Sequence, residues 1–291
     1  LTGAAGFIGS SVAEVLLARG NEVIGLVRAD LVDGAALDAL FADEKTRPDV
    51  VVHLAAWAGV RPSIAKPMVY QRNNLEGTVR LLELARQHDV KPFVFASSSS
   101  VYGARDTVPF SEEDRVDDPI SPYAATKKAG ELLGYTYSHL FGLNFVGLRF
   151  FTVYGPRQRP EMAIHLFAQR ILDGVTIRMH GDGSSSRDYT YIDDIVEGVI
   201  ASIDRATTVD GYRIYNLGGS ETTTLAELIA QIEDACGKKA IIDQVPDQPG
   251  DVPRTFADVS RAKEELGYNP RTPVAVGIPR FVEWLKNRRG D

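Results

Sequence analysis

Short apolar runs alternate along the first half of the chain with segments in which apolar residues recur every three or four positions. The runs at 49–56, 93–96 and 145–151 predict buried strands, and the segment at 74–89 predicts an amphipathic helix. Such alternation is typical of a parallel sheet with helices on both faces. We therefore expect an α/β fold with a doubly wound parallel sheet, whose ligands bind beyond the carboxyl ends of the strands.

The chain opens with glycines at every third position, Gly3, Gly6 and Gly9, directly before a helical pattern that ends near Gly20. The residues at 22–26 then predict a strand. A glycine turn at the start of a helix leaves backbone amides free to bind a pyrophosphate, as in dinucleotide-binding folds. The alternative is a tight strand-to-helix turn without a ligand, because a glycine triplet alone has low specificity.

The spacing after Leu26 is anomalous. Residues 27–31 have the pattern of the end of a further parallel strand and precede a predicted helix at about 34–41. Parallel neighbours need a crossover of about a dozen residues or more, and the sequence leaves no room for one. We predict that a segment is absent between Leu26 and Val27, and with it the acidic residue expected to bind the adenosine ribose. The alternative is a natural shortening with a β-hairpin.

The candidate chemistry lies in Ser98, Tyr123 and Lys127. Tyr123 and Lys127 are four residues apart at the start of a predicted helix, so they share one helix face. A phenol with a pKa of about 10 is a poor base at neutral pH, and a nearby ammonium favours its ionised form. Ser98 follows the strand at 93–96, where its hydroxyl can bridge substrate and tyrosine. An isolated Tyr-x-x-x-Lys pair is common by chance. Here the pair follows a glycine turn and a serine-rich strand end along the chain, and this combination predicts a catalytic site.

His53 and Cys236 are predicted to have structural roles. His53 stands inside an apolar strand, which favours a satisfied structural histidine over a catalytic one. Cys236 is the only cysteine, so the chain has no internal disulfide and no cysteine cluster for a metal. We expect Cys236 to be inert packing near the end of a helix.

Seven segments together resemble the extended short-chain dehydrogenase/reductase family, and within it the nucleotide-sugar epimerases. They are TGAAGFIGS from Thr2, HLAAWAGVRPS from His53, NNLEGT from Asn73, ASSSSVYG from Ala96, SPYAATKKAGE from Ser121, RFFTVYGPRQRPEM from Arg149 and SRDYTYIDD from Ser186. The combination is highly specific, and the resemblance covers essentially the whole chain.

The resemblance implies a Rossmann-type doubly wound parallel sheet with a smaller C-terminal α/β substrate-binding domain. Residues 1–153 and about 188–217 would form the NAD-binding domain, and about 154–187 and 218–291 the nucleotide-sugar-binding domain. It also implies NAD as cofactor, a UDP-sugar as the bound small molecule, no metal, and a homodimer formed through helices such as those near Asn74 and Tyr123.

The expected site residues follow from these motifs. The expected cofactor contacts are Gly3, Gly6, Phe7, Ile8, Gly9, Asp30, Leu31, Leu54, Ala55, Ala56, Asn73, Tyr123 and Lys127. The expected substrate contacts are Arg61, Ser99, Ser100, Thr152, Arg159, Arg187 and Arg254. Arg187 and Arg254 are assigned to the nucleotide diphosphate, because a guanidinium presents a planar fork of donors to phosphate. A solvated surface arginine is the alternative for Arg254.

The identity of the sugar is predicted from the residues that follow two of the strands. Related dehydratases carry an Asp-Glu pair where this chain has Ser99 and Ser100, and the related decarboxylases carry one Glu there. Galactose-type 4-epimerases carry Asn where this chain has Thr152. The neutral hydroxyls suit a sugar carboxylate, so the closest resemblance is to the UDP-glucuronate 4-epimerases, which form UDP-galacturonate. The alternatives are a UDP-glucose or UDP-N-acetylhexosamine 4-epimerase, and a non-catalytic NAD-binding regulator on the same fold.

The resemblance implies a mechanism without net redox change. Tyr123, as phenolate, would take the proton of the sugar 4-hydroxyl while hydride leaves C4 for NAD. The 4-keto sugar would turn in the pocket, and hydride would return to its opposite face. A 4-keto uronate is a β-keto acid that can lose carbon dioxide. We expect Thr152, Ser99 and Ser100 to hold the carboxylate away from that geometry.

The alternation weakens in the second half of the chain. We predict a loop at 180–189, a helix at 193–204 and a strand at 212–217, the last two returning to the first domain by resemblance. Further helices are predicted at 224–237, 258–267 and 274–288.

Composition and net charge limit the kinds of partner that we expect for this chain. The 291 residues are 44% hydrophobic and 24% charged, which is ordinary globular composition. The net charge of −7 argues against a general nucleic-acid binder, and no apolar run reaches the length of a membrane span. With a single cysteine and no visible signal peptide, a reducing cytoplasm is the simplest location.

Overall fold

The computed structural model describes residues 1–26, 31–32, 34–219, 221–246 and 252–290. Its centre is a four-stranded parallel sheet in the order β1 (Val51–His53), β2 (Pro92–Ser98), β3 (Asn144–Phe150) and β7 (Tyr212–Leu217). β2 and β3 are aligned over their full length, and Ser98 pairs with Phe150. The carboxyl ends of the strands therefore meet at one edge of the sheet, where the sequence places Ser98.

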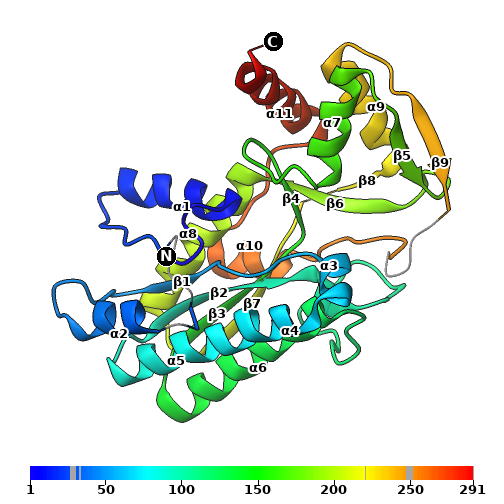
Figure 1. Ribbon diagram of the computed structural model, residues 1–291. Coiled ribbons are helices and arrows are strands. Elements are labelled where there is room, and N and C mark those ends of the chain that lie inside the picture. The colour runs from blue at the N-terminus through cyan, green and yellow to red at the C-terminus, as the bar shows by residue number, and fades with distance from the viewer. Residues whose placement is uncertain (27–30, 33, 220, 247–251, 291) are drawn as a thin grey trace.

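Helices cover both faces of this sheet (Figure 1). α1 (Phe7–Ala18) packs on α8 (Ile192–Thr208), and α8 packs on β2 and β3. On the other face α6 (Pro122–Phe141) packs on β2 and β3 beside α5 (Gly77–Gln87), with α2 (Ala35–Ala42) against α5. The predicted doubly wound architecture is confirmed. The helix predicted at 193–204 packs on this sheet as α8, and the strand predicted at 212–217 belongs to it as β7.

The N-terminal residues continue the sheet beyond β1. Thr2 forms parallel bridges with both His53 and Leu26. The regular strand predicted at 22–26 is not formed among the described residues, although this segment runs beside the N-terminal residues. The Leu1 amine donates to the Ile24 carbonyl at 2.9 Å, and the Leu26 amide donates to the Leu1 carbonyl at 3.0 Å. The partner turns away at Gly3, where φ is +72°, so the pairing stays an isolated bridge. Residues 27–30, with the predicted chain junction and Asp30, lie outside the described residues.

Two smaller sheets follow. β4 (Thr152–Tyr154) pairs in parallel with β6 (Ser186–Tyr191), which pairs antiparallel with β8 (Thr222–Thr224). β5 (Ile177–His180) pairs in parallel with β9 (Ile242–Val245). The predicted loop at 180–189 is therefore wrong from residue 186 onward, because β6 finds a hydrogen-bonding partner on each side.

Four helices complete this second part. α7 (Ala163–Asp173) and α11 (Val274–Arg289) pack on α9 (Leu225–Cys236), and α10 (Ser260–Leu266) packs on α8 and β7. α9 begins with the expected capping residues, which form a reciprocal Thr224–Glu227 capping box. Cys236 is buried as expected, and burial raises the pKa of its thiol.

Short helices surround the carboxyl edge of the main sheet. α3 (Val60–Ala65), α4 (Pro67–Tyr70) and a π-helical segment, η1 (Gln71–Glu76), precede α5, and a 3₁₀ turn, η2 (Ser99–Tyr102), follows β2. The helix predicted at 74–89 thus begins in a π-helical turn, a feature frequent at functional sites. No helix in the described ranges combines the length and the apolar character needed to cross a membrane.

Candidate active site

The glycine turn lies close to the end of β1. Gly3 has φ of +72°, and a Cβ atom there would stand 2.9 Å from the Ala55 amide nitrogen. A Cβ atom on Gly9 would stand 2.0 Å from the Gly3 carbonyl oxygen. Only glycine fits both positions. In the described part of the chain no side chain caps α1 at Gly6, so its first amides suit an anionic group.

His53 is a structural residue, as predicted. Its Nδ1 lies 2.8 Å from the Thr2 hydroxyl, and its Nε2 lies 3.0 Å from the Thr78 hydroxyl. Burial lowers the pKa of His53 to about 3, so the ring is neutral at physiological pH. The Thr2 hydroxyl also accepts a hydrogen bond from the Ala55 amide. The histidine therefore fixes the glycine turn to the strand end that lies beside it.

Asn74 is a residue that the sequence reading missed. Its side-chain oxygen accepts from the Trp57 amide at 2.8 Å, and its side-chain nitrogen donates to the Trp57 carbonyl and the Thr126 hydroxyl. It thereby connects the loop after β1 to α6. The predicted Asn73 instead donates to the Val69 carbonyl of the preceding turn. The π-helical turn shifts the helical phase, which a regular helical pattern does not predict.

Ser98, Tyr123 and Lys127 come together between the end of β2 and the start of α6. Tyr123 lies close enough to Ser98 for the serine hydroxyl to lower the pKa of the phenol. The buried Lys127 ammonium donates to the Ala96 carbonyl at 2.7 Å and lies 5.9 Å from the centre of the Tyr123 ring. The Tyr70 ring packs edge-on against the Tyr123 ring, with the two ring centres 6.2 Å apart. The three residues expected to be catalytic therefore form one cluster.

The charge state of this cluster differs from the sequence expectation. The expectation was that Lys127 would lower the pKa of Tyr123, whereas burial raises it above 10 despite opposing effects of the Ser98 hydrogen bond and Arg159. Burial also lowers the pKa of Lys127 to about 7. Burial therefore favours the neutral phenol, because the surrounding protein disfavours charge on both groups.

The hydroxyls expected to contact substrate lie at adjacent strand ends. Ser99 and Ser100 belong to η2, directly after Ser98, and Thr152 starts β4 two residues after the Ser98 partner Phe150. All three are partly exposed. The Ser98 hydroxyl donates to the Ser100 hydroxyl at 3.0 Å, which joins the turn to the catalytic cluster.

The arginines expected at the diphosphate lie on neighbouring segments of the backbone. Ser186 in β6 bridges in parallel with Arg254, and the neighbouring Arg187 donates to the Pro253 carbonyl at 3.2 Å. β6 is the partner of the strand that begins with Thr152, so both arginines lie on the sheet that carries this hydroxyl.

The remaining expected contacts are more dispersed. Arg61 is exposed on α3, which packs on α6, and Arg159 is exposed and paired with Glu161 at 3.0 Å. Leu31 packs against Gly77 at the start of α5.

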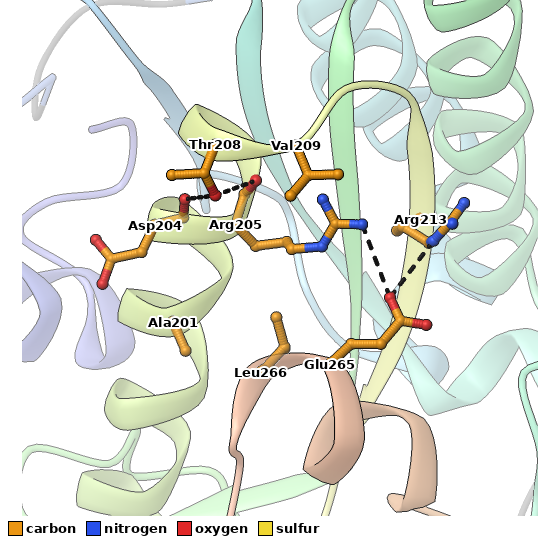
Figure 2. A pocket seen from close by; sticks show the side chains of 8 residues that line it. All are labelled: Ala201, Asp204, Arg205, Thr208, Val209, Arg213, Glu265 and Leu266. Carbon is orange, nitrogen blue, oxygen red and sulfur yellow. Dashed lines mark hydrogen bonds and ion pairs between the residues drawn. The ribbon is translucent and has the colours of Figure 1, made fainter.

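Two surface pockets lie elsewhere. One of about 650 Å³ lies between α8, β7 and α10 and contains Glu265 directed towards Arg205 and Arg213 (Figure 2). The other, of about 530 Å³, shares Arg213 and Glu265 with it. Neither is lined by Ser98 or Tyr123, so the candidate site is defined by the side-chain cluster at the strand ends.

The known proteins that this chain resembles agree with one another in the family they indicate. The family model described as "NAD dependent epimerase/dehydratase family" matches residues 1–218. The chain is 41% identical to the UDP-glucuronate 4-epimerase of Thermodesulfobacterium geofontis over 314 residues, which cover 98% of this chain and 95% of the relative. It is 38% identical to Protein CapI of Staphylococcus aureus over 325 residues, which cover 98% and 97%.

Solved structures agree. The UDP-glucuronic acid 4-epimerase from Bacillus cereus, in complex with UDP-glucuronic acid and NAD, is 34% identical with a TM-score of 0.91, covering 99% of this chain and 98% of that one. The UDP-glucose 4-epimerase from Thermotoga maritima, with UDP-glucose, is 31% identical with a TM-score of 0.92 and the same coverage.

The sequence alignments, at 314 and 325 residues, are longer than this chain of 291. The relatives therefore carry residues without a counterpart here, as an absent segment would require. Its place between Leu26 and Val27 stays a prediction.

The protonation of Lys127 should make the stability of the ligand-free chain depend on pH. Its pKa is about 7 in the folded chain and 10.5 in a model peptide, so between these values the unfolded chain binds the extra proton. Stability should then rise with pH by roughly 1 kcal/mol per unit. We expect Lys127→Met to remove this contribution, measured as the free energy of unfolding in urea at about pH 7 and pH 9. An identical pH dependence in both proteins would contradict the assignment.

Proposed function

This chain belongs to the NAD dependent epimerase/dehydratase family, and we propose that it interconverts UDP-glucuronate and UDP-galacturonate by epimerisation at C4. The observation that carries the proposal is the Ser98–Tyr123–Lys127 cluster beside the glycine turn, followed by a turn whose side chains are neutral hydroxyls. Relatives named UDP-glucuronate 4-epimerase, and a related structure in complex with UDP-glucuronic acid and NAD, support this choice of sugar.

We assign the two ligands to different parts of the chain. Residues 1–153 and about 188–217 would bind NAD, and about 154–187 and 218–291 would bind the nucleotide sugar. The glycine turn fits NAD because Gly3 and Gly9 let the turn pack tightly on itself and on the Ala55 backbone, and because no described side chain caps the start of α1 at Gly6. The small residues Ala55 and Ala56 let a flat ring approach the end of β1.

The chain's own residues would move a proton at the sugar. NAD, when bound, supplies the hydride acceptor for C4 and a positively charged ring. Tyr123 takes the proton of the 4-hydroxyl and later returns it, while Ser98 holds the oxygen between them. Since burial keeps Tyr123 protonated in the free chain, positive charge must gather beside it before it acts as a base. Lys127, with a pKa of about 7, can provide part of that charge.

The substrate would lie across both parts. Arg187 and Arg254 would bind the diphosphate, with Arg61 and Arg159 as further contacts. Ser99, Ser100 and Thr152 would hold the sugar carboxylate through hydrogen bonds. An acidic side chain in their place would repel it. Holding the carboxylate fixed also keeps the 4-keto intermediate from the geometry in which it loses carbon dioxide.

We expect the purified protein to convert UDP-glucuronate into UDP-galacturonate, followed by proton NMR of the sugar anomeric signals. Tyr123→Phe should lower kcat by about two to four orders of magnitude, because it removes the group that transfers the proton. Tyr135→Phe, at an exposed tyrosine of the same helix, is the matched control and should retain activity. Turnover of UDP-glucose or a UDP-N-acetylhexosamine without UDP-glucuronate would favour the alternative substrates. No turnover of any UDP-sugar would favour a non-catalytic NAD-binding protein.

We expect Thr152→Ala to release carbon dioxide and a UDP-pentose alongside UDP-galacturonate, because the carboxylate of the keto intermediate is less constrained. The ratio of pentose to uronate product by NMR measures this effect, and Ser99→Ala and Ser100→Ala extend it. Product ratios that stay at the wild-type value in all three variants would contradict the assigned role.

A homodimer completes the proposal. Four large apolar residues on the outer side of α6 are exposed: Leu132, Tyr135, Leu140 and Phe141. Large apolar side chains left exposed on one helix favour an association site, and α6 lies beside α5 on the same face of the sheet. A second copy of this chain would cover it.

We expect the wild-type protein to have the mass of a dimer by size-exclusion chromatography with light scattering. Leu132→Asp combined with Leu140→Asp should shift it towards the monomer, because a buried carboxylate without a partner is costly. Leu17→Asp, at an exposed leucine on α1 across the sheet, should leave the mass unchanged. A monomeric wild type would refute the proposal.

A further inference from the structure

One face of α6 contacts the last three residues of β2. Tyr123, Lys127 and Glu131 follow one another at intervals of four residues and so line the same face of the helix. Tyr123 lies beside Ser98, whose hydroxyl lowers the pKa of the phenol, and Lys127 donates to the Ala96 carbonyl. Glu131 accepts a hydrogen bond from the hydroxyl of the residue between them, Ser97, at 2.6 Å. The family motif accounts for the first two contacts and leaves the third unexplained.

Glu131 is fully buried in an ion pair with Arg149 of β3. Its Oε1 accepts from the Arg149 Nε at 2.9 Å, and its Oε2 accepts from the Arg149 Nη2 at 2.9 Å. The Lys128 ammonium lies 3.7 Å from Oε2. A buried ion pair of this kind stabilises a fold no better than well-packed apolar residues, so its presence calls for a role in fixing geometry.

Arg149 continues the network to the turn after Ser98. Its Nη1 donates to the Tyr102 hydroxyl at 3.0 Å, and its guanidinium lies 4.9 Å from the centre of the Tyr102 ring. The Tyr102 hydroxyl donates to the Asn216 side-chain oxygen of β7 at 2.7 Å. Tyr102 is the last residue of η2. The turn is therefore held at both ends, through Ser97 before it and Tyr102 within it, by the same carboxylate–guanidinium pair.

We propose that Glu131 and Arg149 are positioning residues for the reaction: acting through Ser97 and Tyr102, they fix the serine turn against α6 so that the Ser98 hydroxyl meets Tyr123. The Ser97–Glu131 hydrogen bond holds the end of β2 on α6, and with it the backbone from which Ser98 and the following turn continue. The inference rests on the proposed function, because it assigns these residues to the same catalytic cluster.

Two hydroxyl deletions test the network without leaving a buried charge unpaired. Ser97→Ala and Tyr102→Phe each remove one link and keep the Glu131–Arg149 pair. The matched controls are Ser202→Ala, a buried serine that donates to the Gly198 carbonyl within α8, and Tyr215→Phe, a buried tyrosine whose hydroxyl donates to Glu265 at the pocket of Figure 2. Each control removes a buried hydroxyl of the same type outside the network.

We expect Ser97→Ala and Tyr102→Phe to lower kcat for the UDP-sugar by about 10- to 100-fold, because small misplacements of reacting groups have effects of this size. KM should stay within about two-fold of wild type, and Tm should fall no further than in the controls. Ser97→Thr keeps the hydroxyl and should restore kcat. A kcat equal to that of the controls, or a loss of activity that follows only the loss in Tm, would overturn the proposal.

A second readout does not depend on the substrate. In ligand-free protein with ¹³C-labelled tyrosine, the Cζ signal of Tyr123 is assigned with Tyr123→Phe and reports the surroundings of the phenol beside Ser98. We expect Ser97→Ala to shift this signal in the same direction as Ser98→Ala, with no shift in Ser202→Ala. A shift in Ser98→Ala alone would refute the positioning role. If wild-type protein epimerises no UDP-sugar, the proposed function fails, while this measurement still decides the positioning role.

Discussion

The contact between α6 and the carboxyl end of β2 is the constraint on which the candidate site depends. The helix lies so close to the sheet that a Cβ atom on Gly130 would stand 2.4 Å from the Phe95 ring, and one on Gly134 would stand 2.3 Å from the Phe145 ring. At this separation a lysine on the helix reaches a backbone carbonyl of the strand, and a tyrosine reaches its last serine. The reactive hydroxyls thus owe their proximity to two glycines that do no chemistry.

The same enclosure explains why Tyr123 and Lys127 both favour their neutral forms. Burial raises the pKa of Tyr123 and lowers that of Lys127 to about 7, because neither charged form is well solvated between helix and sheet. His53 is neutral for the same reason, and the charge of Glu131 is balanced by Arg149. In the proposed function, a site of this kind becomes reactive when a bound ligand brings positive charge beside Tyr123.

The sequence predicted the parts of this arrangement that depend on short-range patterns. Alternating apolar runs located the parallel strands, with the bounds of the strand at 212–217 correct, and the motif spacing placed Ser98, Tyr123 and Lys127 near one another. The π-helical turn that directs Asn74 inward was not predictable, because it changes the helical phase without a distinctive composition. β6 was missed because the strands that pair with it are distant in the sequence. The direction of the Tyr123 pKa shift was missed because it depends on burial, which the spacing of residues does not reveal. The Glu131–Arg149 pair joins residues from different elements, so neither motif indicated it alone.

Epimerisation of UDP-glucuronate in heavy water tests the central claim most directly, because it follows the hydrogen at C4. If Tyr123 moves only the hydroxyl proton and the C4 hydrogen leaves and returns as hydride, the UDP-galacturonate formed should carry ordinary hydrogen at C4 by NMR. Deuterium at C4 would show proton abstraction from carbon, and an absence of UDP-galacturonate would show that this sugar is not the substrate. Either result would contradict the account given for this chain.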